Sequence, residues 1–154
     1  MRHLVVPRTL SFLFHGDEVL VLKRSPHARL FPGKVNGVGG HVERNEDVVA
    51  AAHREIHEET GLQITDLWLA GILHVDGVLG QADPLPGGYR PGVMVFIFTG
   101  QAPTRNVIPS DEGELLWVPL TAVSSLDWVD GDPGLLLQAL DSHRLGRPFF
   151  THKP

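Results

Sequence analysis

"GHVERNEDVVAAAHREIHEETGL", residues 40–62, is the stretch that decides the fold. Its middle is rich in alanine and glutamate, which favour a helix, and Gly61 is a typical residue just past a helix end. At the other end Asn45 can cap the helix, while Glu46 and Asp47 suit a first turn in which the helix dipole favours negative charge. The pattern therefore predicts a helix that begins at about residue 45 and ends at Gly61.

Three glutamates of this helix share one face. At about 100° per residue, Glu55, Glu58 and Glu59 fall within an arc of about 100°. They flank an apolar stripe that we expect to face the core, namely Val48, Val49, Ala52 and Ile56. The two histidines four residues apart resemble the zinc-protease helix H-E-x-x-H, in which the glutamate works beside the histidine pair. Here His53 and His57 point away from the glutamates, which predicts an exposed helix flank instead of a zinc site.

The clustered carboxylates need positive charge. Acid-rich helix faces are usually solvated and often pair with lysine or arginine. Arg54 is the only lysine or arginine between Glu46 and Gly61, and carboxylates this close repel one another. Hard oxygen ligands at this density suit Mg²⁺ or Mn²⁺. A divalent cation site and a merely solvated face both remain open at this point.

Composition narrows the class of protein. The 154 residues are 42% hydrophobic and 20% charged, which predicts one globular domain over residues 1–154. A net charge of −5 argues against a nucleic acid polymer as partner. The absence of cysteine excludes disulfides and favours a reducing, cytoplasmic setting. No apolar run is long enough for a membrane span, and the start of the chain lacks the features of a signal peptide.

The rest of the chain predicts alternating strands and helices. Strands are expected over 8–14, 18–24, 64–75, 92–100 and 114–120, a second helix over 133–145, and loops over 25–40 and 76–92. The "HGDE" segment between the first two strands is typical of a hairpin. Since no repeat or linker separates these elements, the fold class is an α/β sandwich with a mixed sheet.

The spacing within 40–62 resembles the Nudix signature, G-x5-E-x7-R-E-U-x-E-E-x-G-U with U aliphatic. Nine specified positions match: Gly40, Glu46, Arg54, Glu55, Ile56, Glu58, Glu59, Gly61 and Leu62. The resemblance implies a Nudix-type α/β/α sandwich whose catalytic loop–helix–loop holds divalent cations, Mg²⁺ or Mn²⁺, against a diphosphate. It implies that Glu55, Glu58 and Glu59 bind metal or activate water and that Arg54 and Glu46 orient them. The glycine backbone, Gly40 in particular, would approach the cations.

Other segments are similar to the MutT-like oxidised-purine nucleoside triphosphatases. In "GKVNGVGGHVE", Asn36 falls on the asparagine that hydrogen-bonds the purine. "PSDEGELLWVPL" places Glu112 on a further metal-binding or catalytic acid. "LDWVDGDPGLLLQAL" places Trp128 on the stacking aromatic and Asp130 on a base-reading carboxylate.

Thr9 matches a pocket threonine of the same group. Lys23, Arg24, Arg29 and Lys34 are candidates for triphosphate contact, and Arg24 is chosen among them by position. The chain departs from the group's pattern at Val35, where the group has tryptophan, and at Gly131, where it has a second aspartate. Asp132 could substitute for that aspartate with a shift of one residue.

Three functions are compatible with these motifs. The first is hydrolysis of a nucleoside triphosphate to a monophosphate and pyrophosphate, with 8-oxo-dGTP as the favoured kind of substrate. The second is hydrolysis of ADP-ribose, a dinucleoside polyphosphate or an unmodified dNTP. The third is a catalytically silent domain that binds a nucleotide, which the intact set of glutamates disfavours. The partner in each case is a small nucleotide; a homodimer is possible, and loop 76–92 could cap the substrate or join such a dimer.

Overall fold

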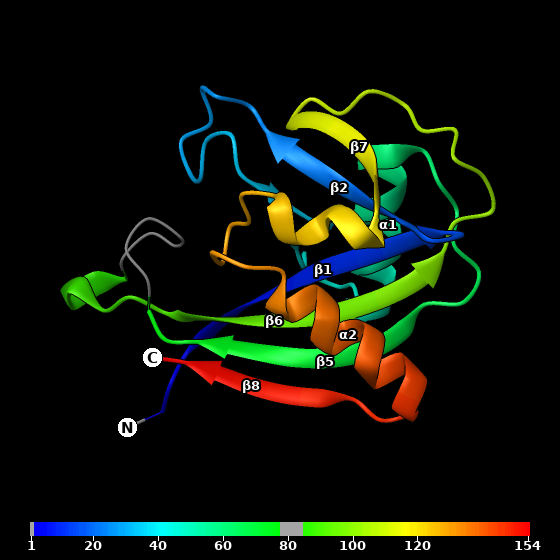
Figure 1. Cartoon of the computed structure of the whole chain (residues 1–154). Coiled ribbons are helices and arrows are strands. Elements are labelled where there is room, and N and C mark those ends of the chain that lie inside the picture. The colour runs from blue at the N-terminus through cyan, green and yellow to red at the C-terminus, as the bar shows by residue number, and fades with distance from the viewer. Residues whose placement is uncertain (1, 78–84) are drawn as a thin grey trace.

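The computed structural model describes residues 2–77 and 85–154. Its strands form one mixed β-sheet, and its helices lie against that sheet (Figure 1). The strands are β1 (Val5–His15), β2 (Glu18–Arg24), β3 (Val35–Asn36), β4 (Val38–His41), β5 (Trp68–Val75), β6 (Gly92–Gln101), β7 (Gly113–Pro119) and β8 (Phe149–Lys153). The helices are α1 (Val48–Thr60) and α2 (Gly134–Leu145), with 3-10 turns η1 (Pro86–Gly88) and η2 (Leu120–Ser125).

The sheet runs in the order β3-β2-β1-β6-β5-β8, and β4 and β7 pair with β1 and β2. The β1–β6 and β5–β8 pairs are parallel and the others antiparallel. Two apolar clusters separate the layers: one holds Leu135 and Leu136 of α2, the other Ile56 of α1. With α2 in front of the sheet and α1 behind it in Figure 1, this arrangement is the expected α/β/α sandwich with a mixed sheet.

The helix that carries the glutamates begins later than expected. Its N-cap is Asp47, whose Oδ1 accepts a hydrogen bond of 2.8 Å from Ala50 N. Asn45 has a left-handed backbone with φ of 63° and lies outside the helix. The prediction of Asn45 as the cap was wrong because two acidic candidates follow it, and the side chain of Asp47 reaches the free amide group. Gly61 closes the helix with φ of 77°, as expected.

The core-facing stripe of α1 also differs from the prediction. Val49 is 46% exposed, whereas Ala51, Ala52 and Ile56 are buried. The buried direction is therefore turned toward the glutamates, and it includes Glu59, which is 6% exposed. The helical spacing had placed the acids beside the stripe, but packing against β1 and β4 decides which of them is buried.

Segment 25–40, expected to be a loop, ends in the two short strands β3 and β4, and the chain after α2 forms β8. β4 was not predicted because its glycines are poor strand formers in isolation. A Cβ at Gly39 would clash with the carbonyl oxygen of Thr9 on β1, so this strand pairing requires glycine. The hairpin between β1 and β2 is confirmed, with His15 opposite Glu18. Part of the 76–92 loop, residues 78–84, lies outside the described residues.

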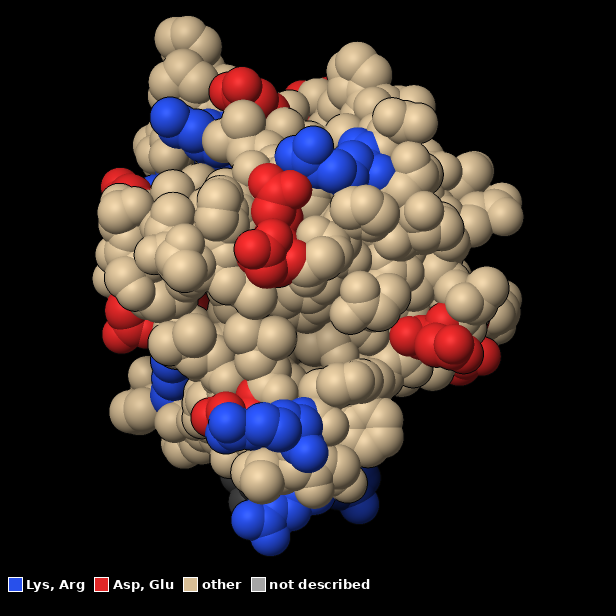
Figure 2. All heavy atoms as spheres, turned by 45° about the vertical axis from the view of Figure 1, so that its right-hand side comes forward, with Lys and Arg blue, Asp and Glu red and all other residues tan. Residues whose placement is uncertain are grey.

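None of the helices formed by the described residues could span a membrane. On the face shown in Figure 2, acidic and basic side chains are interspersed among neutral ones without a continuous basic surface. That face therefore offers no large positive field for a nucleic acid backbone.

Candidate active site

Arg54 organises the acidic residues around α1. It makes a two-point ion pair with Glu46, with Nη2–Oε1 at 2.6 Å and Nε–Oε2 at 3.0 Å. Its Nη1 donates to Glu55 at 2.9 Å and to Glu58 at 3.3 Å, and its Nη2 donates to the carbonyl of His41 on β4 at 3.0 Å. These bonds hold the pKa of Glu46 down at about 2 and raise that of Arg54. One cation thus fixes the helix, its preceding loop and β4 together.

Glu59 differs from Glu55 and Glu58, the other glutamates of this face, because it makes no ion pair with a described residue. Its carboxylate is buried, and neither oxygen has a hydrogen-bond partner of good geometry among the described residues, although the Gly39 backbone and the Glu112 carboxyl lie near enough to affect its pKa. Burial, followed by the negative charges of Glu112 and Glu55, raises the pKa of Glu59 to about 8. A buried, partnerless carboxylate is costly unless something positive satisfies it.

Glu112 reaches this group from outside the helix. It lies in the turn before β7, which is closed by a bridge between Ser110 and Gly113. Its carbonyl accepts from Ser25 N at 3.3 Å, so the turn is tied to the end of β2. The neighbouring Glu114 lies on β7 opposite Lys23 and is exposed. The fold therefore brings Glu112, and not Glu114, toward Glu59.

Gly40 gives the backbone close access to the acids. A Cβ at this position would collide with the carboxylate of Glu55. Since Gly40 lies opposite Thr9 on β1, the absence of a side chain lets Glu55 lie directly against the β4 backbone. The Gly40 backbone and the Glu55 carboxylate consequently lie side by side, and backbone carbonyls and carboxylates are both ligands of hard cations.

These residues fit a divalent metal ion. The donors are carboxylate oxygens, the ligands that Mg²⁺ and Mn²⁺ prefer. Glu59 contributes two buried oxygens without partners, and the charges of Glu55 and Glu112 lie close enough to shift its pKa. Glu58 is 58% exposed at the other flank of the helix and pairs with Arg54. The structure thus brings Glu55, Glu59 and Glu112 together and leaves Glu58 at the rim.

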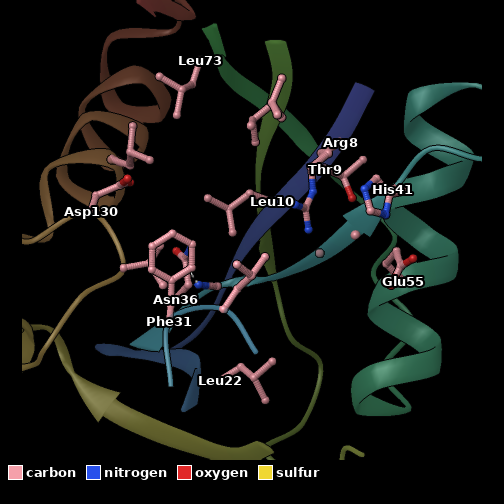
Figure 3. Close-up of a pocket in the computed structure, with 18 of the residues that line it drawn as sticks. Arg8, Thr9, Leu10, Leu22, Phe31, Asn36, His41, Glu55, Leu73 and Asp130 are labelled. Atoms are coloured by element: carbon pink, nitrogen blue, oxygen red, sulfur yellow. Dashed lines mark hydrogen bonds between the residues drawn. The ribbon is translucent and has the colours of Figure 1, made fainter. Parts of the chain in front are cut away.

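A pocket of about 430 Å³ opens beside this acidic group, within the range typical of small-molecule sites. Figure 3 shows residues of β1, β4 and α1 on one side and Phe31, Asn36 and Asp130 on the other. Its charged, polar, aromatic and glycine lining residues include Arg8, Thr9, Arg24, Phe31, Asn36, Gly39, Gly40, His41, Glu55, Glu112 and Asp130.

We call the side of the pocket formed by Phe31, Asn36 and Asp130 the far wall. Positive and polar groups line the pocket between this wall and the glutamates. Arg8 lines the pocket, and its pKa is lowered by burial and then by the charge of Arg24. The pKa of His41 is lowered by burial and by Arg8, which favours a neutral imidazole. Arg24 donates from Nε to the carbonyl of Leu30 at 2.7 Å, which orients its guanidinium. Thr9 is buried, and its hydroxyl has no partner among the described residues.

Arg8 and His41 were missed from the sequence. Arg8 begins the strand expected over 8–14, and its pairing with His41 was hidden because β4 lies in the segment expected to be a loop. Of the other cations considered for phosphate contact, Lys34 lies 3.6 Å from Asp127, while Lys23 and Arg29 are exposed. The available signal was Arg8, a basic residue at the start of the predicted strand that pairs with Gly39 and Gly40.

The far wall is assembled by pairing between β3 and segment 127–130. Val35 N donates to Asp127 O at 2.9 Å, and Val129 N donates to Val35 O at 3.0 Å. This ladder places Asn36 and Asp130 on the same pocket. The Oδ1 of Asn36 accepts from Gly37 N at 2.9 Å, which orients the amide, and Asp130 lies 3.2 Å from the Nζ of Lys153 on β8.

Trp128 does not line this pocket. It is 3% exposed within the α2 side of the core, and its Nε1 donates to Val123 O at 2.7 Å. The expected stacking role is therefore corrected: the indole is buried in the core, while Val129 and Asp130 of the same segment line the pocket. Asp132 does not take the place of the missing aspartate either, because its Oδ1 accepts from Gly134 N at 2.7 Å at the start of α2.

Phe31 supplies an aromatic ring to the pocket instead. It lies beside Asn36 in Figure 3. Its backbone is left-handed with φ of 50°, a conformation that non-glycine residues adopt rarely and that clusters at functional sites. No local signal in the sequence marks this residue, because it lies within a proline- and glycine-containing segment typical of a plain loop.

Comparison with known proteins identifies the family. The model described as the NUDIX domain matches residues 6–139. The chain therefore belongs to the Nudix family and is a Nudix hydrolase.

Individual relatives differ in their named activities. The chain is 29% identical to the Nudix hydrolase YvcI of Bacillus subtilis over 148 residues, which are 96% of this chain and 87% of that protein. It is 28% identical to the NAD-capped RNA hydrolase NudC of Chromobacterium violaceum, covering 93% of this chain but only 45% of that protein. The chain thus spans less than half of the NudC relatives.

Solved structures share the fold at low identity. A MutT protein of Bacillus halodurans superposes with a TM-score of 0.69 at 23% identity, covering 97% of this chain and 92% of the other. The NUDIX domain of Shewanella oneidensis NrtR, solved with ADP ribose, gives a TM-score of 0.67 at 17% identity, covering 92% and 88%. These likenesses confirm the Nudix-type sandwich.

Proposed function

We propose that this protein hydrolyses a nucleoside triphosphate to the monophosphate and pyrophosphate with Mg²⁺ or Mn²⁺, and that an oxidised purine dNTP such as 8-oxo-dGTP is its favoured substrate. The observation that carries this is the buried, partnerless carboxylate of Glu59 beside Glu55 and Glu112, at the edge of a pocket with a polar far wall. Carboxylates of this kind favour a bound cation and a phosphate beyond it.

The residues divide the chemistry between them. Glu55, Glu58, Glu59 and Glu112, with the backbone of Gly40, would hold the metal. When bound, a divalent cation neutralises phosphate charge and lowers the pKa of attacking water. Glu58 or Glu55 accepts the proton of that water, and Arg54 keeps both carboxylates oriented through its bonds of 3.3 and 2.9 Å.

The triphosphate would cross the middle of the pocket. Arg8 and Arg24 offer guanidinium groups there, which suit phosphate oxygens. The buried hydroxyl of Thr9, free of any described partner, is a further donor. Neutral His41 can donate or accept without adding charge beside the acids.

The base would occupy the far wall. The ring of Phe31 provides a stacking face, and Asn36 and Asp130 provide donor and acceptor groups for the base edge. Because the Oδ1 of Asn36 is used by Gly37, its Nδ2 donors are left for the ligand. A purine oxidised at C8 carries an N7–H donor where guanine has an acceptor, and a carboxylate such as Asp130 distinguishes donors from acceptors at a base edge.

A substrate panel tests the proposal. 8-oxo-dGTP, dGTP, ADP-ribose and a dinucleoside polyphosphate are compared with Mg²⁺ and with chelator, and products are identified by chromatography. We expect metal-dependent release of pyrophosphate and a higher kcat/KM for 8-oxo-dGTP than for dGTP. Asp130→Asn should shift that ratio, whereas Asp132→Asn, which alters only the start of α2, should leave it unchanged. A ratio near one in the unaltered protein would refute the oxidised-purine preference.

ADP-ribose is a second candidate. A smaller hollow of about 170 Å³ lies on the other side of Asp130, lined by Gln138, Thr151 and Lys153 among others. Lys153 and polar groups there could receive a second ribose. The NudC relatives are named as NAD-capped RNA hydrolases, and the NrtR domain was solved with ADP ribose. Faster hydrolysis of ADP-ribose than of both triphosphates would favour this candidate.

A further inference from the structure

Three histidines and one aspartate converge at the edge of the sheet, away from the acidic helix. His3 precedes β1, His74 lies in β5, Asp76 follows β5, and His152 lies in β8. None of the four lines the pocket described above. The cluster therefore stands apart from the proposed active site.

One carboxylate oxygen is the common neighbour. The Oδ1 of Asp76 lies 3.1 Å from His152 Nε2, 3.7 Å from His74 Nε2 and 3.8 Å from His3 Nε2. The candidate ligand atoms of His3, His74 and Asp76 all lie within 4.8 Å of one another. In a tetrahedral zinc site with bonds of about 2.0–2.1 Å, ligand atoms are separated by roughly 3.3 Å. The distances from Asp76 Oδ1 to the three imidazole nitrogens are close to that spacing. His152 lies outside the group whose ligand atoms are all within 4.8 Å of one another, so its side chain would have to rotate to reach the same ion.

The fold holds these side chains in place. His74 lies directly opposite His152 in the β5–β8 pair, and Asp76 N donates to Lys153 O at 3.0 Å. The ring of His74 is flanked by those of His3 and His152, with centroid separations of 5.0 and 4.9 Å. His3 lies over Gly92, where a Cβ would come within 2.5 Å of its Nε2. A residue larger than glycine there would displace His3 from the group.

The cluster contains an unsatisfied atom that points to a ligand. His74 Nε2 is buried and has no hydrogen-bond partner among the described residues, since its distance to Asp76 is too long for one. A buried polar atom of this kind needs a partner. His3 also has an outer contact, because its Nδ1 lies 3.0 Å from the hydroxyl of Tyr89. Such a bond leaves Nε2 directed toward the cluster, as in metal sites where the second ring nitrogen is hydrogen-bonded.

We propose that His3, His74, Asp76 and His152 bind one transition-metal ion of the Zn²⁺ class. Imidazole nitrogens with one carboxylate suit Zn²⁺, Co²⁺ and Ni²⁺, in contrast to the oxygen-only donors of the acidic helix. The ion would join the N-terminal segment, β5 and the C-terminal strand β8, so its role is to fasten the ends of the chain to the sheet. This site is independent of the proposed hydrolytic function.

Zinc binding by untagged, chelator-treated protein tests the proposal. Zn²⁺ is titrated by calorimetry in millimolar Mg²⁺, which occupies the acidic helix, and Co²⁺ is followed by its visible absorption. We expect one strongly bound Zn²⁺ per chain and intense tetrahedral Co²⁺ bands. His74→Gln and His152→Gln should weaken binding by at least about 10-fold, and Tyr89→Phe by about 10-fold through the loss of its contact with His3.

Two control variants separate this site from zinc bound elsewhere on the protein. His27→Gln changes an exposed histidine outside the cluster and should bind Zn²⁺ as the unaltered protein does. The double variant Glu58→Gln, Glu59→Gln removes charge from the acidic helix and should retain the zinc site. His3→Gln lies outside the sheet, so it tests the site even where His74→Gln impairs folding. Equal Zn²⁺ affinity in His3→Gln, His152→Gln and His27→Gln would overturn the proposal.

Discussion

The acidic helix and the far wall of the pocket are built in opposite ways. Around α1, a single arginine contacts three glutamates within 3.3 Å and a carbonyl of β4. The far wall has few polar bonds, and its residues come from segment 25–34, from β3 and from 127–130. Charges are dense and tightly bonded on one side, while on the other a ring, an amide and a carboxylate face a cavity.

This difference assigns the two regions different tasks. On the proposed function, cleavage of the phosphate chain is common to every candidate substrate, so we assign it to the contiguous acidic stretch. The base is variable, and its discrimination depends on groups that are unpaired when the wrong ligand binds. Changes at the helix should therefore lower turnover of every substrate, whereas changes at the wall should alter ratios between substrates.

The largest effect is expected at the glutamates of α1. Glu58→Gln and Glu59→Gln keep size but remove negative charge, so turnover should fall by about 100-fold or more for all substrates. The measurement is kcat with saturating Mg²⁺, alongside circular dichroism to verify folding. Near-normal turnover in the double variant would remove the proposed mechanism.

His53→Ala and His57→Ala are the matched controls on the same helix. Neither histidine is among the described residues that line the pocket, so both variants should turn over at nearly the original rate. A large loss in both that added zinc restores would revive the zinc-protease interpretation.

Glu112 should give the next effect although it lies about 50 residues beyond α1 in the sequence. If it completes the metal site, Glu112→Gln lowers kcat by roughly 10- to 100-fold with little change in KM. Glu114→Gln, exposed on β7, should change neither constant appreciably. Equal and small effects in steady-state kinetics of the two variants would reduce Glu112 to a solvated loop acid.

Phe31 and Trp128 provide the sharpest test of the wall. Stacking contributes about 1–3 kcal/mol per base, so Phe31→Ala should raise KM for purine substrates by roughly 5- to 150-fold. Trp128→Phe should leave KM unchanged and lower the melting temperature, because it removes the bond to Val123 and part of the core. Thermal unfolding and kinetics on both variants check this. The reverse pattern would restore the indole as the stacking platform.

The acidic helix was also easier to predict from local sequence than the far wall of the pocket. The helix was placed to within about three residues because capping, helix propensity and the glycine stop act locally. The fold class was confirmed because strand and helix patterns alternate clearly. The loop prediction holds for residues 25–34 but was wrong for 35–40, since β4 is a glycine-rich strand whose partner on β1 is about 30 residues away. Phe31, Arg8 and the inward turn of Trp128 depend on that pairing and on tertiary packing, which no local pattern shows.

The effect furthest from turnover is a pH dependence of stability caused by Glu59. Its pKa is raised to about 8 in the folded protein, from an ordinary value of 4.5. Between these values the unfolded chain has released the proton and the folded chain retains it. Stability must therefore fall as pH rises from 4.5 toward 8, by at most about 1.4 kcal/mol per pH unit for one proton.

Urea unfolding of chelator-treated protein at several pH values between about 5 and 8 measures this slope. Glu59→Gln cannot ionise, so its slope should be flatter than that of the unaltered protein over the same range. Saturating Mg²⁺ should flatten the slope too, because a bound cation favours the ionised carboxylate. Glu46 does not interfere, since its pKa of about 2 places its own contribution in acid, where stability is lost as pH falls below 4.5. Identical slopes in the two proteins would mean that Glu59 is ionised without a metal. Neighbouring protein groups would then already stabilise its negative charge.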